Sequence, residues 1–136
     1  MIGIPELLRD TKTIAVVGLS PDPFRASHGV SEYMQMQGYR IIPVNPAATE
    51  ILGQPAYPDL ESIPGQVDME NIFRRSEVVG RVVESAIRIG AKSVWMQEGV
   101  VNEEAADAAR AAGLAVVMDR CLLKEHQVLG AAYFLR

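Results

Sequence analysis

The segment between residues 18 and 26 offers the clearest candidate chemistry in this chain, the binding of a phosphate group. Gly18 permits a tight exit from the apolar run before it. Ser20, Arg25 and Ser27 then supply a hydroxyl, a guanidinium and a second hydroxyl just before the expected start of a helix. Helix N-termini attract phosphate through their free N–H groups, and a guanidinium adds charge-assisted hydrogen bonds. The loop therefore predicts a phosphate or pyrophosphate site, with a surface loop carrying a serine cap and a solvated arginine as the alternative.

The same loop argues against a dinucleotide site of the usual kind. The fingerprint Gly-x-Gly-x-x-Gly is incomplete, because Ser20 occupies the place of its second glycine. An NAD site usually has Asp or Glu at the end of the second strand, where it binds the ribose hydroxyls. This chain has Asn45 followed by Pro46 at that point, a pair that is also common in turns. The NAD interpretation is weakened by both features but not excluded.

Two adjacent arginines follow the strand predicted over 69–73, the least typical of the five because it contains Glu70 and Asn71. Arg74 and Arg75 come directly after Phe73 and precede Ser76, which is expected to cap a helix. A guanidinium there is suited to an anionic ligand, and we expect one of the two to reach it. The alternative is a solvated pair, because neighbouring side chains need not point the same way.

A third loop, which begins with Gln97, Glu98 and Gly99, follows the run that contains Trp95. The Glu98 carboxylate is suited to orienting a hydroxyl or an amide, and Gly99 would let a ligand pass close to the backbone. The alternative is an ordinary loop with an exposed acid, which is a weak general base without a second titratable group beside it.

The chain offers little material for catalysis or for metal binding. Cys121 is the only cysteine, and the two histidines, His28 and His126, lie far apart in the sequence. Zinc sites usually need several such ligands, and no nucleophile–base–orienter set can be assembled. Cys121 and His126 are more than one helical turn apart, so we interpret them as a semi-buried cysteine and a helix histidine. Neither a metal site nor a catalytic residue is predicted.

The composition fits one cytoplasmic domain spanning residues 1–136. The chain is 49% hydrophobic and 22% charged, which fills a core and still covers a soluble surface. The net charge of −4 disfavours nucleic acid as the main partner. No apolar run approaches the ~20 residues that span a bilayer. The N-terminal segment shows no signal-peptide core, so we expect neither membrane attachment nor secretion.

The elements that must position these loops alternate along the chain. Apolar runs predict strands, and amphipathic stretches with caps predict helices, so that the loops named above all leave the carboxyl ends of strands. This alternation indicates an α/β fold: a doubly wound, Rossmann-like parallel sheet of five strands in the order 3-2-1-4-5, with helices on both faces. A ligand crevice is then expected at the carboxyl ends of strands one and four. The expected strands are 13–18, 39–44, 69–73, 93–96 and 115–118, and the expected helices are 5–10, 27–37, 76–89, 102–113 and 122–129, with 49–64 as a loop.

Seven stretches in the same order, covering nearly the whole chain, resemble the stand-alone bacterial and archaeal CoA-binding proteins. These proteins are similar to the N-terminal domain of the succinyl-CoA synthetase α subunit and of ADP-forming acyl-CoA synthetases. The matching stretches are Ile14–Pro21, Ile42–Pro46, Ile51–Gly53, Val67–Asp68, Phe73–Arg75, Trp95–Glu103 and Val117–Cys121.

The resemblance implies that coenzyme A lies over the loop after the first strand. It places the phosphates near Ser20, Arg25 and Ser27 and the adenosine near Asn45 and Pro46. The pantetheine arm would then pass Phe73, Arg74 and Gln97 to Gly99. One position departs from the family. Relatives often carry a basic residue directly after the Asn-Pro pair, where it meets the ribose 3′-phosphate, and this chain has Ala47 there. Either Arg40 or Arg25 replaces it, or the affinity is lower.

The resemblance also bears on catalysis, because the phosphohistidine and nucleotide-binding parts of the synthetases lie in other domains. We therefore expect a protein that binds CoA or acyl-CoA without catalysis, as a carrier, a sensor, a partner of an enzyme or a homo-oligomer. The alternatives are an NAD(P)- or CoA-dependent enzyme and an interaction subunit that has lost its ligand. A further hypothesis is a mixed disulfide between Cys121 and CoA; burial of this thiol under the last helix is the favoured alternative.

Overall fold

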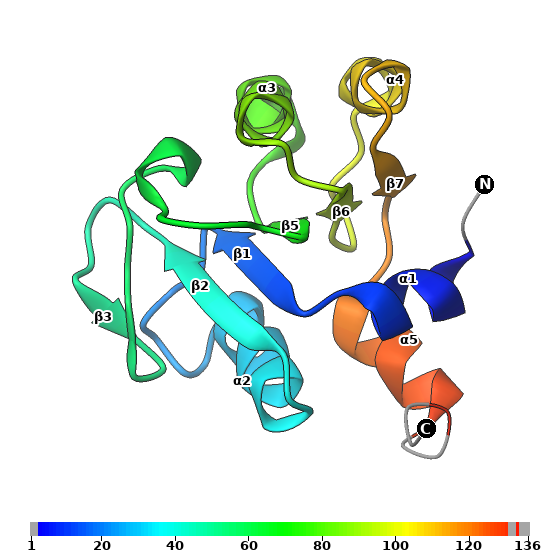
Figure 1. Ribbon diagram of the computed structural model, residues 1–136. Helices are drawn as coiled ribbons and strands as arrows, with labels where there is room; N and C mark the ends of the chain where they lie inside the picture. Colours follow the sequence, from blue (N-terminus) through cyan, green and yellow to red (C-terminus); the bar gives the residue numbers. More distant parts are fainter. Residues whose placement is uncertain (1–2, 131–132, 134–136) are drawn as a thin grey trace.

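A computed structural model of the chain describes residues 3–130 and 133, and its centre is a parallel five-stranded sheet (Figure 1). The strands are largely apolar because helices cover both faces of the sheet. Even the least typical of them, the segment with Glu70 and Asn71, is a strand whose four residues are all buried. The five strands are β1 (Thr13–Val17), β2 (Arg40–Val44), β5 (Met69–Ile72), β6 (Ser93–Met96) and β7 (Ala115–Val117).

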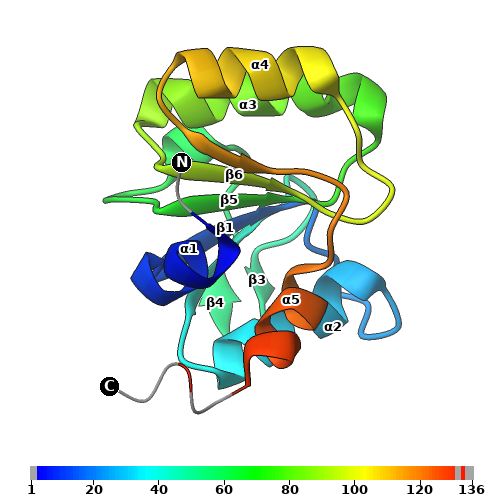
Figure 2. The ribbon, with the colours of Figure 1, turned by 90° about the vertical axis from the view of Figure 1, so that its right-hand side faces the viewer.

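The helices form two layers, one on each face of the sheet (Figure 2). One layer contains α1 (Ile4–Asp10), α2 (Ala26–Met36) and α5 (Leu122–Leu129), and the other contains α3 (Val79–Ile89) and α4 (Glu103–Ala111). Each layer encloses its own apolar core, one around Trp95 and Met34, the other around Ile72 and Val83. The predicted α/β class, with a doubly wound parallel sheet of five strands, is confirmed.

The order of the strands differs from the predicted one. Along the sheet they lie β2-β1-β5-β6-β7, so the five strands counted along the chain are arranged 2-1-3-4-5 instead of 3-2-1-4-5. The third strand, β5, pairs with β1 on the side away from β2. The direction of winding therefore reverses between β1 and β5, and the ligand crevice moves from strands one and four to strands one and three.

Contacts of the segment after β2 explain this order. Tyr57 pairs with the outer edge of β2, where its N–H donates to the Pro43 carbonyl and its own carbonyl accepts from Asn45 N–H. That edge is thus occupied before the third strand begins. The start of β5 is held beside β1, because Asp68 Oδ2 accepts from the N–H groups of Lys12 and Thr13 at 3.0 and 3.1 Å.

The segment predicted as a loop at 49–64 contains short regular elements. They are β3 (Glu50–Ile51) and β4 (Gln54–Pro55), which pair as an antiparallel hairpin, and the 3-10 turn η1 (Leu60–Ser62). A second 3-10 turn, η2 (Ser76–Val78), precedes α3.

Two of the predicted helix caps are wrong and two are confirmed. Ser27 lies inside α2, whose N-cap is Arg25, and its hydroxyl instead accepts from Ser20 N–H at 3.0 Å. Ser76 begins η2, and its hydroxyl accepts from the N–H of Val101. The Ser27 hydroxyl thus bonds to the preceding loop and the Ser76 hydroxyl to a loop 25 residues later, and neither bonds to the first turn of its own helix. Asn102 caps α4 through the N–H of Ala105, and Gly90 ends α3 in the left-handed conformation, as predicted.

Candidate functional site

Three adjoining hollows open at the carboxyl ends of the strands, and together they form one crevice. The loop hollow, about 320 Å³, lies over Gly18, Ser20, Arg25 and Ser27. The central hollow, about 400 Å³, shares Phe73 with it, and the outer hollow, about 200 Å³, shares Arg74 with the central one. Each volume lies near or below the low end of the range of about 300–1,000 Å³ for small-molecule sites. An extended ligand that spans all three therefore suits the crevice better than a compact one.

The loop hollow is shaped by hydrogen bonds within its own loop. Ser27 Oγ accepts from Ser20 N–H, and Ser20 Oγ accepts from Asp22 N–H, each at 3.0 Å. A hydroxyl that accepts still carries a proton to donate, so both serines keep a donor for an anion. Asn45 braces the loop from the end of β2, since its Nδ2 donates to the Leu19 carbonyl at 3.0 Å.

Gly18, directly after β1, lies against the backbone of the segment that follows β5. Its φ is +88°, a conformation that side chains other than glycine rarely adopt. A Cβ at this position would lie 2.4 Å from the Phe73 carbonyl oxygen and 3.0 Å from Cδ of Arg74. The glycine therefore allows the segment after β5 to lie against the exit of β1, which brings Phe73 and Arg74 to the crevice.

The distribution of cations singles out this crevice. Within residues 3–130 and 133, six cationic side chains form ion pairs with carboxylates. Six others form none, and four of these line the crevice: Arg25, Arg74, Arg75 and Arg81. The remaining two, Lys12 and Arg40, line a hollow at the opposite edge of the sheet. Unpaired guanidinium groups at a hollow are suited to an anionic ligand.

Two helix N-termini strengthen the positive field of the crevice. Neither α2 nor α3 has an acidic residue in its first turn, whereas α1, α4 and α5 each have at least one. Arg25 is the N-cap of α2, and Arg81 is the third residue of α3. A cation at the positive end of a helix dipole is unfavourable by roughly 0.3–1 kcal/mol. A bound anion would offset this cost in both places.

The third loop from the sequence analysis is only partly in the crevice. Gln97 lies in the wall of the central hollow, is buried, and donates from Nε2 to Asn71 Oδ1 at 3.0 Å. Glu98 lines the same hollow and is paired with Lys124 Nζ at 3.0 Å. Gly99 is outside the lining of the three hollows; its φ is +84° and its N–H donates to Asp119 Oδ1.

Asn45 is likewise outside the lining, whereas the next residue, Pro46, lies in the wall of the outer hollow. The Asn45 side chain is engaged at both ends, because its Oδ1 also accepts from Ala47 N–H at 2.8 Å. Its role in the structure is to hold the loops after β1 and β2 together.

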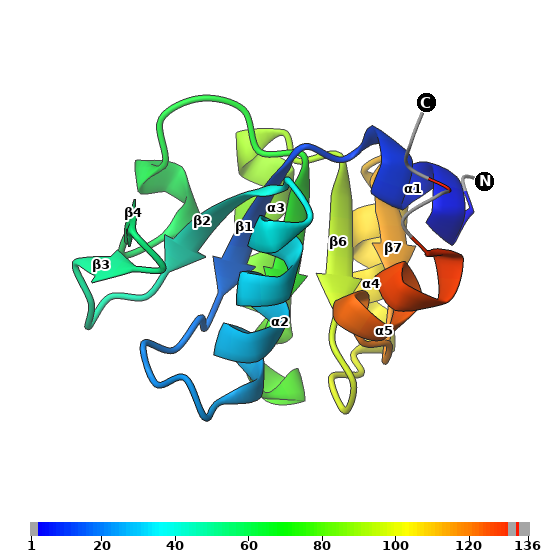
Figure 3. The same ribbon diagram turned by 90° about the horizontal axis from the view of Figure 1, so that it is seen from below.

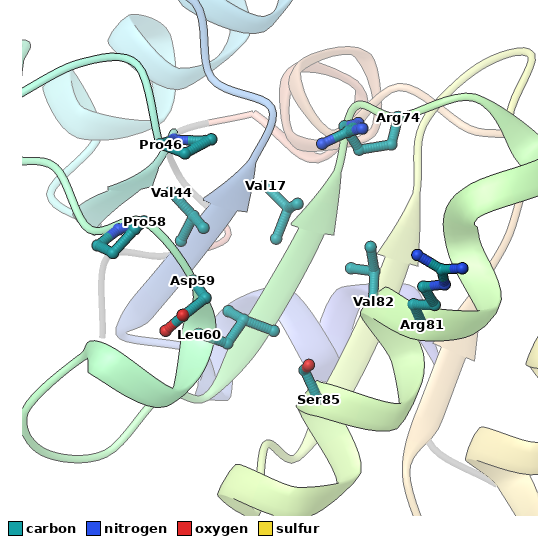
Figure 4. A pocket seen from close by; sticks show the side chains of 10 residues that line it. All are labelled: Val17, Val44, Pro46, Pro58, Asp59, Leu60, Arg74, Arg81, Val82 and Ser85. Carbon is teal, nitrogen blue, oxygen red and sulfur yellow. The ribbon is translucent and has the colours of Figure 1, made fainter.

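Sequence reasoning missed Arg81, which lies seven residues after Arg74 and faces the same hollow (Figure 4). No usable signal was present in the sequence, because the helix predicted over 76–89 has the acid Glu77 in its first turn and Arg81 beyond it. Only the start of α3 at Val79, after the 3-10 turn η2, places Arg81 in a first turn that lacks an acid.

Cys121 lies in the wall of the central hollow, although it follows the marginal strand β7. The chain after β7 passes back to the face that α2 covers, where α5 lies (Figure 3). Trp95 Nε1 donates to the Arg120 carbonyl at 2.8 Å and holds this segment against β6. The residue is 9% exposed, so it is nearly buried at the crevice wall.

His126 is distant from this chemistry. It is buried, shares a 2.8 Å hydrogen bond between its Nδ1 and Tyr33 Oη, and lines the hollow at the opposite edge. Burial lowers the pKa of His126 below its ordinary value. Among the described residues, no three His, Cys, Asp or Glu side chains gather as a metal site requires, and no helix has the length and apolarity to cross a membrane.

Comparison with known proteins identifies relatives of nearly full length. A family model described as a CoA binding domain matches residues 12–127. The chain is 47% identical over 125 residues to the uncharacterized protein YneT of Bacillus subtilis, covering 92% of this chain and 93% of YneT. A solved structure titled hypothetical protein from Pyrococcus horikoshii OT3 is 37% identical, with a TM-score of 0.89 over 95% of this chain and 96% of that one.

A more distant relative is an enzyme. The ADP-forming acetate–CoA ligase I of Archaeoglobus fulgidus is 27% identical over 121 residues, which are 82% of this chain. The match spans only 18% of the ligase. What is shared with the enzyme is thus one part of it.

Proposed function

The chain belongs to the family of CoA binding domains, and from this premise we propose that it binds coenzyme A or an acyl-CoA in the crevice between β1 and β5. The observation that carries the proposal is the gathering, along three connected hollows, of four arginines that form no ion pair with any described residue. Coenzyme A is long, flexible and anionic, with its phosphates at one end and an uncharged pantetheine arm at the other. A crevice with cationic parts beside apolar parts fits these properties.

Each part of the ligand has a suitable place. The loop hollow, with Arg25 and the hydroxyls of Ser20 and Ser27, would hold the pyrophosphate. The central hollow is lined mostly by apolar atoms and reaches Gln97, which suits the amide-bearing pantetheine arm. The outer hollow, with Val17, Val44 and Pro46, also adjoins the loop hollow, because Val17 in its wall directly precedes Gly18, and it would hold the adenine ring on the other side of the pyrophosphate.

The first expected result is that CoA binds more tightly than NAD. Nothing acidic ends β2, where Asn45 uses its side chain to brace the loops instead of binding a ribose. Isothermal titration calorimetry of ligand-free protein with CoA, acetyl-CoA, NAD and NADP measures this directly. Equal or tighter binding of NAD would overturn the proposal, and no binding of any of the four would favour a subunit without a ligand.

The second expected result concerns Arg25. A hydrogen bond to a charged group is worth roughly 1.5–3 kcal/mol, and ~1.4 kcal/mol is a factor of ten in affinity. Arg25→Ala should therefore weaken CoA binding about tenfold or more. Arg40→Ala is the matched control, because it removes another unpaired arginine, at the opposite edge of the sheet. If both variants bind CoA like the wild type while circular dichroism shows an intact fold, Arg25 is only solvated.

We further propose that the bound CoA is carried, sensed or presented to an enzyme partner instead of being chemically altered. In the described crevice, Glu98 is engaged by Lys124, and Cys121 has no base hydrogen-bonded to its sulfur. A nucleophile with an adjacent base is the usual requirement for acyl transfer. The mixed disulfide between Cys121 and CoA stays a hypothesis.

A further inference from the structure

The outer hollow has an apolar floor and a cationic side. Val17, Val44 and Leu60 form part of its floor. Arg74 and Arg81 lie on one side of it, and Asp59 lies on the other (Figure 4). A flat, uncharged ring in such a place would have two guanidinium groups beside it.

Neither of the two arginines forms an ion pair with the carboxylate in the lining of this hollow. Asp59 is the acid in the lining, and its Oδ1 accepts from Ser62 N–H at 2.9 Å and from Ser62 Oγ at 2.6 Å. Among residues 3–130 and 133, neither Arg74 nor Arg81 forms an ion pair with it or with any other acid. Arg81 also occupies the first turn of α3, where the helix dipole disfavours a cation. The lining of the outer hollow thus has two guanidinium groups and one carboxylate, and no ion pair among the described residues joins them.

The crevice therefore has two separate cationic places. The first is the loop hollow, lined by Gly18 and Arg25, and the second is the outer hollow, lined by Val17 and Arg81. Coenzyme A has two separate anionic groups, the pyrophosphate and the phosphate on the ribose 3′-oxygen. Of the two replacements for a basic residue at position 47 considered from sequence, Arg40 is at the wrong edge and Arg25 belongs to the loop hollow.

We propose that Arg81, together with Arg74, binds the ribose 3′-phosphate and makes the site selective for ligands that carry it. The proposal rests on the proposed function and deepens it, because it assigns the selectivity of the site to a residue on α3. Guanidinium groups are suited to this task through bidentate hydrogen bonds to phosphate oxygens. Ligands with the same pyrophosphate but no 3′-phosphate, such as dephospho-CoA and NAD, would lose these bonds.

The test is a comparison of two ligands with three proteins. Calorimetry with CoA and with 3′-dephospho-CoA is carried out on the wild type, on Arg81→Ala and on Arg40→Ala. The wild type and Arg40→Ala should bind CoA about tenfold or more tightly than dephospho-CoA, which corresponds to ~1.4 kcal/mol. Arg81→Ala should bind CoA about as weakly as the wild type binds dephospho-CoA, while its affinity for dephospho-CoA is unchanged.

Other outcomes identify which statement fails. If the wild type binds CoA but does not distinguish it from dephospho-CoA, selectivity for the 3′-phosphate is refuted and the proposed function stands. If Arg81→Ala weakens both ligands equally, or neither, Arg81 does not contact the 3′-phosphate. If folded wild-type protein binds neither ligand, the proposed function fails and this inference fails with it.

Discussion

Replacing Glu70 by glutamine is expected to stabilise the protein by an amount that grows with pH. Glu70 is fully buried in the middle of β5, and neither carboxylate oxygen has a hydrogen-bond partner among the described residues. Burial, with a smaller contribution from the charge of Glu61, raises the pKa of Glu70 well above its ordinary value of 4.5. The folded protein therefore holds this side chain as a neutral acid across a range of pH in which the unfolded chain ionises it.

The sign of the pH dependence follows from this difference. Below pH 4.5 both states keep the proton, so glutamine and the neutral acid are nearly equivalent. Above that pH the unfolded state releases the proton, and the wild type loses about 1.4 kcal/mol of stability per pH unit until the raised pKa is reached. The advantage of Glu70→Gln should therefore grow as the pH rises above 4.5, for as long as the folded protein keeps the proton.

Urea unfolding of both proteins between pH 4 and pH 8 measures the effect. Glu84→Gln is the control, since it removes the same charge from the exposed face of α3 and should not reproduce the trend. A constant difference between Glu70→Gln and the wild type would mean that Glu70 ionises in the folded protein as it does in the unfolded chain.

Replacing Gly18 by alanine is expected to lower the free energy of unfolding by about 3 kcal/mol. The left-handed conformation costs a residue with a Cβ roughly 1–2 kcal/mol. The new Cβ would also lie 2.4 Å from the Phe73 carbonyl oxygen, a backbone atom that can move only if β1 and β5 separate. The variant should also bind CoA more weakly, because that separation displaces Phe73 and Arg74.

The matched control for this change is Gly29→Ala. Gly29 lies on the exposed side of α2, its added Cβ would meet nothing within 4 Å, and its φ is not positive. Alanine in a helix interior is favoured over glycine by roughly 0.5–1 kcal/mol, so this variant should be slightly more stable than the wild type. Denaturation by urea compares the two. Equal midpoints for Gly18→Ala and the wild type would show that the two strands are not in close contact at Gly18.

The sequence by itself determined the elements and the edge at which the site lies. Continuous apolar runs such as 13–18 mark strands covered on both faces, and caps such as Asn102 and Gly90 mark helix ends, because these signals are local. Alternation of the two then requires a parallel sheet whose loops gather at the carboxyl ends of its strands. The phosphate loop and the arginines after the third strand were placed at the crevice for this reason.

Only the tertiary structure decided which strands lie side by side and what lines the crevice between them. The third strand lies beside β1 because Tyr57 covers the free edge of β2 and Asp68 holds β5 at the start of β1. Arg81 lies in the outer hollow on α3, and Cys121 lies in the central hollow because the Trp95 bond to the Arg120 carbonyl holds its segment against β6. These contacts join residues that are distant in sequence, and their energies depend on the whole packing of the chain, so no local pattern of residue types records them.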